Sequence, residues 1–315
     1  MQLKTELTQL LDIEIPIIQG GMAWVATGEL AAAVSAAGGL GVIGAGNAPA
    51  DVIEKEIDKV EKLTDKPFGL NIMLLSPFAE DIVKLALRRN VPVITTGAGN
   101  PGKYVKMFQE NGSKVIPVIP SVALAKRMER LNVDAVIAEG TEAGGHIGEL
   151  TTMTLVPQVA DAVDIPVIAA GGVADGRGLA AVFSLGAVGA QIGTRFVCSE
   201  ECIASEQYKK AILQAGDRDA IVTGRSTGHP VRNLKNSLTR ELDALEKKCV
   251  DPKKIEEIGS GKLREAVIEG NVDHGSVMAG QIAGMIKDIK TVKMILDEIT
   301  ENCIEVLEEK LNLIK

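Results

Sequence analysis

Short apolar segments alternate with amphipathic segments along the chain up to residue 196. Eight of the apolar segments are rich in Val, Ile and Ala and lack polar alternation, which is typical of strands buried on both faces. We predict strands at Ile15–Met22, Gly39–Gly46, Phe68–Leu74, Val91–Thr96, Lys114–Pro120, Ala135–Glu139, Ile165–Gly171 and Ala187–Phe196. Such strands normally form a parallel sheet that helices cover on its outer face.

The segments between these strands carry apolar residues at helical spacing. We predict helices at Gly28–Ala37, Ala50–Leu63, Phe78–Arg89, Val122–Leu131, Leu155–Ala162 and Gly178–Leu185. Strands that alternate with helices in this way favour a TIM (β/α)8 barrel of the α/β class over an open doubly wound sheet. The number of strands does not prove that the sheet closes, so the open sheet is the alternative.

The alternation stops after Phe196, where the chain becomes more polar. This change predicts a smaller lobe inserted after the eighth strand. Further helices are predicted at Leu238–Cys249, Pro252–Ile258, Gln281–Ile289 and Lys293–Leu311. The predicted domains are a barrel, residues 1–196 and 281–315, and an inserted substrate-covering lobe, residues 197–280.

Composition and charge narrow the class of protein. The 315 residues include 34 Lys and Arg against 42 Asp and Glu, a net charge of −8, so neither nucleic acid nor an anionic membrane is an expected partner. The first residues lack the apolar core of a secretory signal, and no apolar run reaches the length of about 18 residues that a membrane span needs. We therefore expect a cytoplasmic protein whose four cysteines are free thiols.

Barrel enzymes carry their chemistry on the loops that follow the carboxyl ends of the strands. Four of these loops are rich in glycine, at Gln19–Ala23, Gly44–Asn47, Thr95–Gly99 and Ala143–Gly148. Glycine lets a planar ligand or a phosphate group approach the backbone closely. A tight turn would explain any single loop, but the recurrence of glycine at four strand ends favours a ligand.

Two further glycine loops predict a phosphate site. Ala170–Gly178 follows the seventh predicted strand and Gly193–Phe196 ends the eighth. TIM barrels often bind phosphate at these two loops through backbone N–H groups and a helix N-terminus. Asp175 is expected to cap a helix that begins at Gly176. The alternative is a turn and cap without a ligand, and the spacing does not match the Rossmann fingerprint.

The chain has only three histidines. His146 lies in the glycine loop after the sixth predicted strand, near Glu139 and Glu142, where a catalytic group of a barrel belongs. Its imidazole can give or take a proton near neutral pH. A structural or merely exposed histidine is the alternative. His229 is expected to have a role in its loop, and His274 to be solvated.

Metal binding and a serine nucleophile have little support. Cys198 and Cys202 lack a second ligand pair at zinc-finger spacing, so no metal site is predicted. Gly224–Gly228 matches the GxSxG pattern around Ser226. The pattern needs a sharp strand-to-helix turn, whereas this segment lies in the polar lobe, so we interpret it as a chance match.

Nine segments together are typical of one known family. They are Pro16–Met22, Gly69–Met73, Pro120–Val122, Glu139–His146, Ala169–Val173, Gly189–Phe196, Thr223–Arg225, Pro230–Asn233 and Gly275–Gln281. With them the chain resembles, over nearly its whole length, the flavin-dependent enoyl-acyl-carrier-protein reductase II family, within the nitronate monooxygenase-like flavin barrels. The EAGGHIG, PVRN and GSVMAGQ segments resemble the reductase branch more than the wider group.

The resemblance implies FMN at the barrel mouth and NADH or NADPH as co-substrate. It implies that the FMN phosphate contacts Gly171, Gly172, Gly193 and Thr194. It implies that Gly21, Met22, Ala23 and Asn71 line the isoalloxazine ring, that Glu139 and Gln191 lie near the ribityl chain or the ring, and that Met278 covers the flavin and the substrate tunnel. A monovalent cation is also known in the reductase branch, but no segment gives a site for it.

The implied reaction is reduction of a trans-2-enoyl thioester on acyl carrier protein, the last step of each fatty-acid elongation cycle. His146 is expected to polarise the thioester carbonyl or to protonate the α-carbon. Arg232 and Asn233 are expected to face the acyl-thioester arm. Arg232, Lys235 and Arg240 are candidates for a basic patch that docks the acidic carrier, with ordinary solvated charge as the alternative. A homodimer is expected.

Three other functions remain open. A nitronate monooxygenase would use the same FMN barrel, with His146 as the base toward a nitroalkane carbon. A flavin-independent phosphosugar or nucleotide isomerase would use the two phosphate loops for its substrate. A non-enzymatic flavin-binding protein would need no proton donor. The visible spectrum and product analysis discriminate among these functions.

Overall fold

The computed structural model describes residues 3–312, in which eight parallel strands form one barrel. The strands are β1 (Ile17–Gln19), β2 (Gly41–Gly44), β3 (Phe68–Met73), β4 (Val93–Gly97), β5 (Lys114–Ile119), β6 (Val136–Glu139), β8 (Val167–Ala170) and β9 (Gly189–Ile192). Their order in the sheet is β1-β9-β8-β6-β5-β4-β3-β2. A parallel bridge between Ile18 and Leu40 joins β1 to the start of β2 and closes the circle. The predicted TIM barrel is confirmed.

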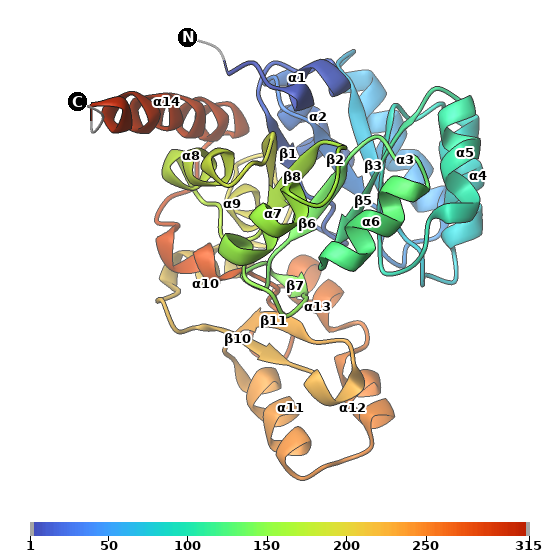
Figure 1. The fold of residues 1–315 in the computed structure, drawn as a ribbon. Coiled ribbons are helices and arrows are strands. Elements are labelled where there is room, and N and C mark those ends of the chain that lie inside the picture. Colours follow the sequence, from blue (N-terminus) through green and yellow to red (C-terminus); the bar gives the residue numbers. More distant parts are fainter. Residues whose placement is uncertain (1–2, 313–315) are drawn as a thin grey trace.

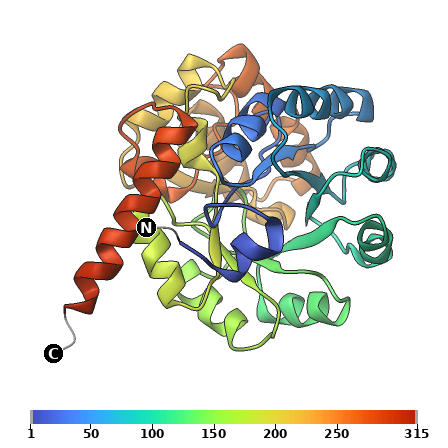
Figure 2. The ribbon, with the colours of Figure 1, turned by 90° about the horizontal axis from the view of Figure 1, so that it is seen from above.

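A helix follows each strand and packs on the outside of the barrel, as Figures 1 and 2 show. These helices are α2 (Gly28–Ala36), α3 (Ala50–Leu63), α4 (Ala79–Arg88), α5 (Gly102–Glu110), α6 (Val122–Arg130), α7 (Thr152–Ala160), α8 (Gly176–Ser184) and α14 (Val292–Leu311). The last of them is separated from β9 by the inserted lobe. It lies against α8 and α2 and so completes the outer ring.

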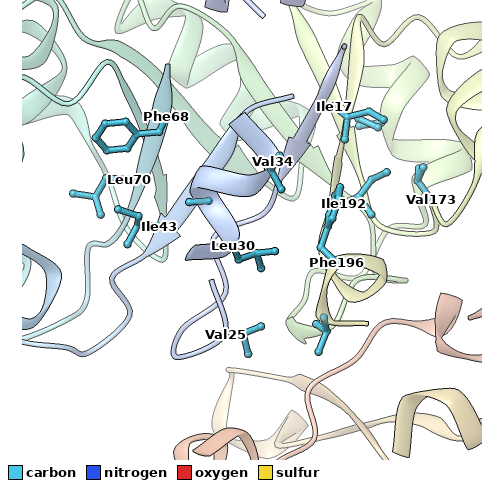
Figure 3. Packing of buried hydrophobic residues seen from close by; sticks show 14 of the residues in the cluster. Ile17, Val25, Leu30, Val34, Ile43, Phe68, Leu70, Val173, Ile192 and Phe196 are labelled. Atoms are coloured by element: carbon cyan, nitrogen blue, oxygen red, sulfur yellow. The ribbon is translucent and has the colours of Figure 1, made fainter. Parts of the chain in front are cut away.

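The strands are apolar throughout because both of their faces are buried. Ile17 points outward into the cluster between strands and helices, whereas Ile18 points into the cluster inside the barrel. The inner cluster is closed at the amino ends of the strands by Leu7 and Leu11 of α1 (Glu6–Leu11), which crosses the near opening of the barrel in Figure 2. Figure 3 shows the outer cluster, where Leu30 and other side chains of α2 lie among those of the neighbouring strands.

The inserted lobe lies at the carboxyl ends of the strands, below the barrel in Figure 1. The elements between β9 and α14 are α9 (Thr194–Val197), α10 (Glu206–Gln214), β10 (Ala220–Thr223), η1 (Arg225–Thr227), β11 (Val231–Leu234), α11 (Ser237–Lys247), α12 (Pro252–Gly259), α13 (Lys262–Glu269) and η2 (Gln281–Met285). β10 and β11 pair antiparallel, and β7 (Gly145–His146) from the loop after β6 joins them as a third strand. The lobe therefore shares a small sheet with a barrel loop.

Two predicted elements are wrong in extent or type. The helix predicted at Gln281–Ile289 is a short 3-10 helix that ends at Met285, since the chain there passes close to another backbone: a Cβ on Gly284 would lie 3.1 Å from the Gly216 carbonyl. The strand predicted to reach Phe196 ends at Ile192, and the chain turns directly into α9. The apolar pattern also missed α1, α5, α10, α13 and the strands β7, β10 and β11.

The apolar core continues from the barrel into both ends of the lobe. Tyr208 and Ile212 of α10 and Ala266 of α13 belong to the same buried cluster as the outer face of the barrel. Only α11 and α12 share a separate small cluster, formed by Leu238, Leu242 and Ile255. Within residues 3–312 no helix combines the length and the apolar character that crossing a membrane requires.

Candidate active site

The loop after β1 lies directly against the carboxyl end of β3. A Cβ on Gly21 would lie 2.2 Å from the Cβ of Asn71, so only glycine allows this approach. The Asn71 amide donates a hydrogen bond to the Thr95 hydroxyl on β4 at 2.9 Å, which fixes its orientation at the mouth. Gly21 and Asn71, both predicted to line the flavin ring, are therefore brought together.

The same loop also meets β9 on its other side. A Cβ on Gly20 would lie 3.3 Å from the Gln191 side chain, and a Cβ on Gly193 would lie 3.3 Å from the Met22 sulfur. Gln191 is buried, whereas Met22 and Gly193 are half-buried. The structure thus gathers residues from β1, β3 and β9 at one end of the barrel, as the predicted cofactor site requires.

The predicted phosphate loops contain backbone donors that the protein does not use. Gly171 and Gly172 have φ values of +88° and +74°, a conformation that favours glycine and turns the chain sharply after β8. In the described part of the chain, the N–H groups of Gly172, Gly193 and Thr194 have no hydrogen-bond acceptor within the protein. Donors left free at a strand-end loop suit an anionic oxygen.

Asp175 caps α8 as predicted. Its carboxylate accepts hydrogen bonds from the N–H groups of Arg177 and Gly178, and the Arg177 guanidinium and these bonds lower the pKa of Asp175 against the opposing effect of burial. The N–H groups of Arg177 and Gly178 in the first turn of α8 therefore already have an acceptor. A phosphate at this place would be held by the Gly172 and Gly193 loops rather than by the N-terminus of α8.

The segment that returns from the lobe, Gly275–Gln281, forms hydrogen bonds both to the predicted phosphate loop after β9 and to the loop after β6. The N–H of Gly280 donates to the Thr194 hydroxyl at 2.9 Å, and the N–H of Gln281 donates to the Glu142 carbonyl at 2.9 Å. A Cβ on Gly145 would lie 3.6 Å from the Met278 sulfur. Met278, predicted to cover the flavin, therefore lies beside β7 at the mouth.

Tyr208 is a residue of this site that sequence reasoning missed. Its phenol is fully buried on α10 and donates a hydrogen bond of 2.7 Å to the carbonyl of Met278. Burial raises the pKa of this phenol, so it stays a donor. The sequence offered only a weak signal for Tyr208, namely that a tyrosine on the core face of a helix needs a hydrogen-bond partner for its hydroxyl.

Trp24 is a second residue that sequence reasoning did not single out. It follows the predicted flavin loop with a positive φ of 64°, which is strained for a residue with a bulky side chain. The guanidinium of Arg264 on α13 lies 5.8 Å from the centre of its ring. This contact connects the lobe to the loop after β1.

His146 and Glu139 are the titratable groups nearest to the mouth. His146 stands on β7 with an exposed side chain, but the surrounding protein and the neighbouring His229 lower its pKa, in that order of importance. Glu139 ends β6 and is half-buried, and removal from water raises its pKa to about 7. At neutral pH the imidazole is therefore neutral, and Glu139 is poised between its two protonation states.

Arg232 and Asn233 are built into the lobe instead of facing outward. The Arg232 guanidinium is buried and donates to the carbonyls of Thr141 at 2.8 and 3.0 Å and of Ala220 at 3.1 Å. The side-chain amide oxygen of Asn233 accepts a hydrogen bond of 2.6 Å from the Ser276 hydroxyl. The expected contact with the acyl-thioester arm stays a prediction, and these internal bonds do not favour it.

The remaining candidate residues take structural roles. Ser226 of the GxSxG pattern lies in η1, the turn between β10 and β11, and not in the strand-to-helix turn that the pattern requires; its hydroxyl donates to the carboxylate of Glu246 at 3.0 Å and so fixes this turn. Burial raises the pKa of Cys198 to about 12, so its thiol is protonated. Residues 3–312 contain no cluster of three or more His, Cys, Asp or Glu side chains that could hold a metal ion.

The residues at the mouth fit FMN. The free N–H groups of the Gly172 and Gly193 loops and the Thr194 hydroxyl suit its phosphate, and the backbone of Gly20 and Gly21, which bears no side chain, lies beside Asn71 and allows a flat ring to approach it closely. The family model for nitronate monooxygenase matches residues 4–302. This chain belongs to the nitronate monooxygenase family. It is thus an oxidoreductase of an FMN-dependent family, and FMN is the cofactor expected for it.

Individual relatives refine this assignment. The structure of FabK, the enoyl-acyl-carrier-protein reductase II, from Thermotoga maritima is 51% identical, covers 99% of each chain and superposes with a TM-score of 0.96. A probable nitronate monooxygenase from Staphylococcus saprophyticus is 34% identical over 99% of this chain and 100% of its own. A carboxyl-CoA dehydrogenase of Mycobacterium tuberculosis, acting on a hydroxy-methyl-oxo-octahydroindene substrate, is 33% identical over 98% of both. The resemblance to the reductase II family is confirmed.

Proposed function

We propose that this protein reduces the double bond of trans-2-enoyl thioesters carried by acyl carrier protein, with NADH or NADPH as reductant and FMN as cofactor. In the net reaction the enoyl thioester gains a hydride at the β-carbon and a proton at the α-carbon, while NAD(P)H becomes NAD(P)⁺. The observation that carries the proposal is the match to FabK, at 51% identity over 99% of both chains. The match to enzymes named nitronate monooxygenase is weaker, at 34%.

His146 is the residue that we assign to the thioester. Negative charge develops on the thioester oxygen as hydride arrives at the β-carbon, so a hydrogen-bond donor at that oxygen lowers the barrier. The pKa of His146 lies below its ordinary value, so at pH 7 the ring is neutral and donates through a ring N–H group. The geometry therefore favours polarisation of the carbonyl, with the proton for the α-carbon taken from solvent at the exposed mouth.

The other residues at the mouth would bind and orient the cofactor. Gly172, Gly193 and Thr194 would hold the FMN phosphate, and Gly21, Met22, Ala23 and Asn71 would contact the ring. Bound FMN would supply the acceptance of hydride from nicotinamide and its donation to the enoyl chain. Met278 would exclude water from above the ring, since Tyr208 and the antiparallel bridge between Asn233 and Met278 hold its backbone in place.

A second candidate is nitronate oxidation with oxygen. The family model and several relatives carry that name, and the same position of His146 would serve a base that removes a proton from the carbon beside a nitro group. Anaerobic and aerobic assays of the FMN-loaded protein separate the two. Consumption of NAD(P)H that depends on crotonyl thioester supports the reductase. Oxygen-dependent loss of a nitronate, with no turnover of the thioester, would overturn it.

His146→Ala tests the assigned role, because alanine has no N–H donor. Reduction of the flavin by NAD(P)H needs stacking and position but no protein proton donor, so it should be unchanged. Reoxidation by enoyl thioester should slow by about 10²–10⁴-fold, the scale of a lost positioned acid or donor. Stopped-flow absorbance of the oxidised flavin follows each step separately. His274→Ala, which changes an exposed histidine paired with Asp273, is the matched control. Unchanged reoxidation in a flavin-loaded His146→Ala protein would remove His146 from the mechanism.

A further inference from the structure

The Gly224–Gly228 segment, which carries no nucleophile, forms a loop that is fixed from behind. The Glu246 carboxylate on α11 accepts hydrogen bonds from the N–H groups of Gly224 and Ser226, both at 2.9 Å, and from the Ser226 hydroxyl. Inside the loop the Thr227 hydroxyl donates to the Gly224 carbonyl at 2.8 Å. Positive φ values at both end glycines, +76° and +79°, set the turn.

The front of this loop presents two basic side chains. Arg225 and His229 are both exposed, and among residues 3–312 neither side chain has an ion-pair or hydrogen-bond partner. The backbone of His229 is nevertheless fixed, because its N–H donates to the Thr227 hydroxyl at 3.1 Å. The acidic side chain bonded to the loop, Glu246, is engaged with N–H groups at the back. The loop is therefore a rigid element that leaves positive charge uncompensated.

The pairing of β7 with β11 brings this loop to His146. In that antiparallel pair His146 lies opposite Val231, and the N–H of Ile147 donates to the Pro230 carbonyl at 3.1 Å. His229 lies two residues before Val231, in the turn that leads into β11, so this turn lies beside β7. The charge of His229 contributes to the lowered pKa of His146, which agrees with this proximity.

We propose that Arg225 and His229 form an anion subsite that binds a phosphate or diphosphate group of a reactant whose reactive end lies at His146. Both reactants of the proposed function, on which the identity of the ligand rests, contain such a group. The nicotinamide dinucleotide has a diphosphate, and the pantetheine arm of the thioester is joined to its carrier or to coenzyme A through phosphate. A guanidinium offers paired donors that match phosphate oxygens. A subsite fixed before binding loses little entropy when the ligand arrives.

Arg225→Gln and His229→Gln test the subsite in the FMN-loaded protein. Calorimetric titrations measure the affinity for the unreactive oxidised nucleotides NADP⁺ and NAD⁺, for coenzyme A and for inorganic pyrophosphate, and steady-state assays compare crotonyl-CoA with crotonyl-N-acetylcysteamine, which has no phosphate. Arg225→Gln should weaken binding of the phosphate ligand by about 10- to 100-fold, since a hydrogen bond to a charged group is lost. Arg225→Lys should restore part of the affinity. Arg127→Gln, which removes an exposed arginine from α6 on the barrel wall, is the matched control.

The pattern across ligands assigns the source of the phosphate. Weaker binding of NADP⁺ and NAD⁺ alone places the dinucleotide at the subsite, and loss for coenzyme A and crotonyl-CoA alone places the pantetheine arm there. Equal effects on crotonyl-N-acetylcysteamine, or equal effects of Arg127→Gln, would overturn the subsite. If the unaltered protein binds neither nucleotide nor coenzyme A, the proposed function fails. The titration with pyrophosphate then still tests the subsite. If the unaltered protein binds pyrophosphate and Arg225→Gln abolishes this binding, the subsite is supported. If the unaltered protein does not bind pyrophosphate, the subsite is overturned.

Discussion

Glu139 shows how the position of one side chain creates a pH-dependent property. Removal from water raises the pKa of Glu139 to about 7 from an ordinary value of 4.5. The folded protein thus binds the proton more tightly than the unfolded chain does. The contribution of this carboxyl to stability is fully present below about pH 4.5 and is lost as the pH rises to about 7.

Glu139→Gln should remove this dependence in the flavin-free protein. The free energy of unfolding in urea, measured across the interval between pH 4.5 and 7, should fall less in the variant than in the unaltered protein. The difference should reach at most about 3 kcal/mol, because one pKa unit corresponds to about 1.4 kcal/mol and Glu139 keeps some solvent contact. Parallel pH profiles for the two proteins would contradict the assigned environment of Glu139.

Gly193 allows the phosphate site to be tested with little damage to the fold. Its φ of −109° suits any residue, and the atom that a Cβ would approach is the Met22 sulfur at 3.3 Å, at the flexible end of a side chain. Gly193→Asp should fold but lose FMN, since a carboxylate would meet the phosphate at close range. Flavin absorbance after gel filtration measures retention, and Gly193→Ala separates the effect of charge from that of bulk. Normal flavin content in a folded Gly193→Asp protein would move the phosphate elsewhere.

Residues with a strong local signature could be found from the sequence. His146 stood out as the one histidine in a glycine loop at a strand end. Asp175 stood out as the cap of a helix, and the structure confirms this cap. Tyr208 and Arg225 could not be found in this way. The importance of Tyr208 depends on its bond to the carbonyl of Met278, and that of Arg225 on the pairing of β11 with β7, which brings its loop to His146. These partners are remote in the chain.

At the scale of elements, the same distinction separates strands that the pattern predicts from those that it misses. β4 and β8 are runs of apolar residues because both faces are buried, and the resulting pattern is contained in the strand itself. β7 has two residues and exists because His146 and Gly145 pair with Val231 and Arg232. Nothing in a two-residue segment encodes a partner that lies more than eighty positions away.

The contact between α10 and the returning segment gives a prediction at this scale. Tyr208→Phe keeps the packing of α10 but leaves the carbonyl of Met278 without its donor. We expect a loss of stability of about 1–3 kcal/mol, the cost of an unsatisfied buried group. We also expect a raised KM for the enoyl thioester with little change in flavin reduction. Urea unfolding and the two half-reactions measure these effects. Tyr104→Phe, which removes a hydroxyl bonded to Glu80 between the outer helices α5 and α4, is the control.

For the whole molecule, the barrel was predictable and the attachment of the lobe was not. Eight alternating units favoured the closed sheet that the structure shows, whereas the fall in apolar content after Phe196 suggested a separate lobe. The structure shows instead that α10 and α13 bury their apolar faces in the core of the barrel, so that only α11 and α12 have a cluster of their own. Contacts of this kind depend on the assembled barrel and leave no periodic signal in either segment.

The net charge of −8 poses a question about the partner that we propose, because acyl carrier proteins are acidic as a class. Two acidic proteins associate only where a local basic area offsets their mutual repulsion. Of the three predicted docking residues, Arg232 is buried and unsuited to this role, whereas Lys235 and Arg240 are exposed. Lys235 lies 3.8 Å from Asp219, and Arg240 donates to the Ser237 hydroxyl, so both charges remain on the surface.

The double variant Lys235→Glu and Arg240→Glu should therefore raise KM for carrier-bound crotonyl thioester about tenfold and leave KM for crotonyl-N-acetylcysteamine unchanged. Added salt should weaken the interaction of the unaltered protein with the carrier and shrink the difference between the two proteins, since exposed charges are screened. Arg127→Glu and Lys126→Glu make the same charge change on α6, an outer helix of the barrel. If this control raises KM for the carrier as much as the lobe variant does, docking depends on the overall charge. Equal effects of the lobe variant on both thioesters would assign Lys235 and Arg240 to the substrate path instead of the carrier.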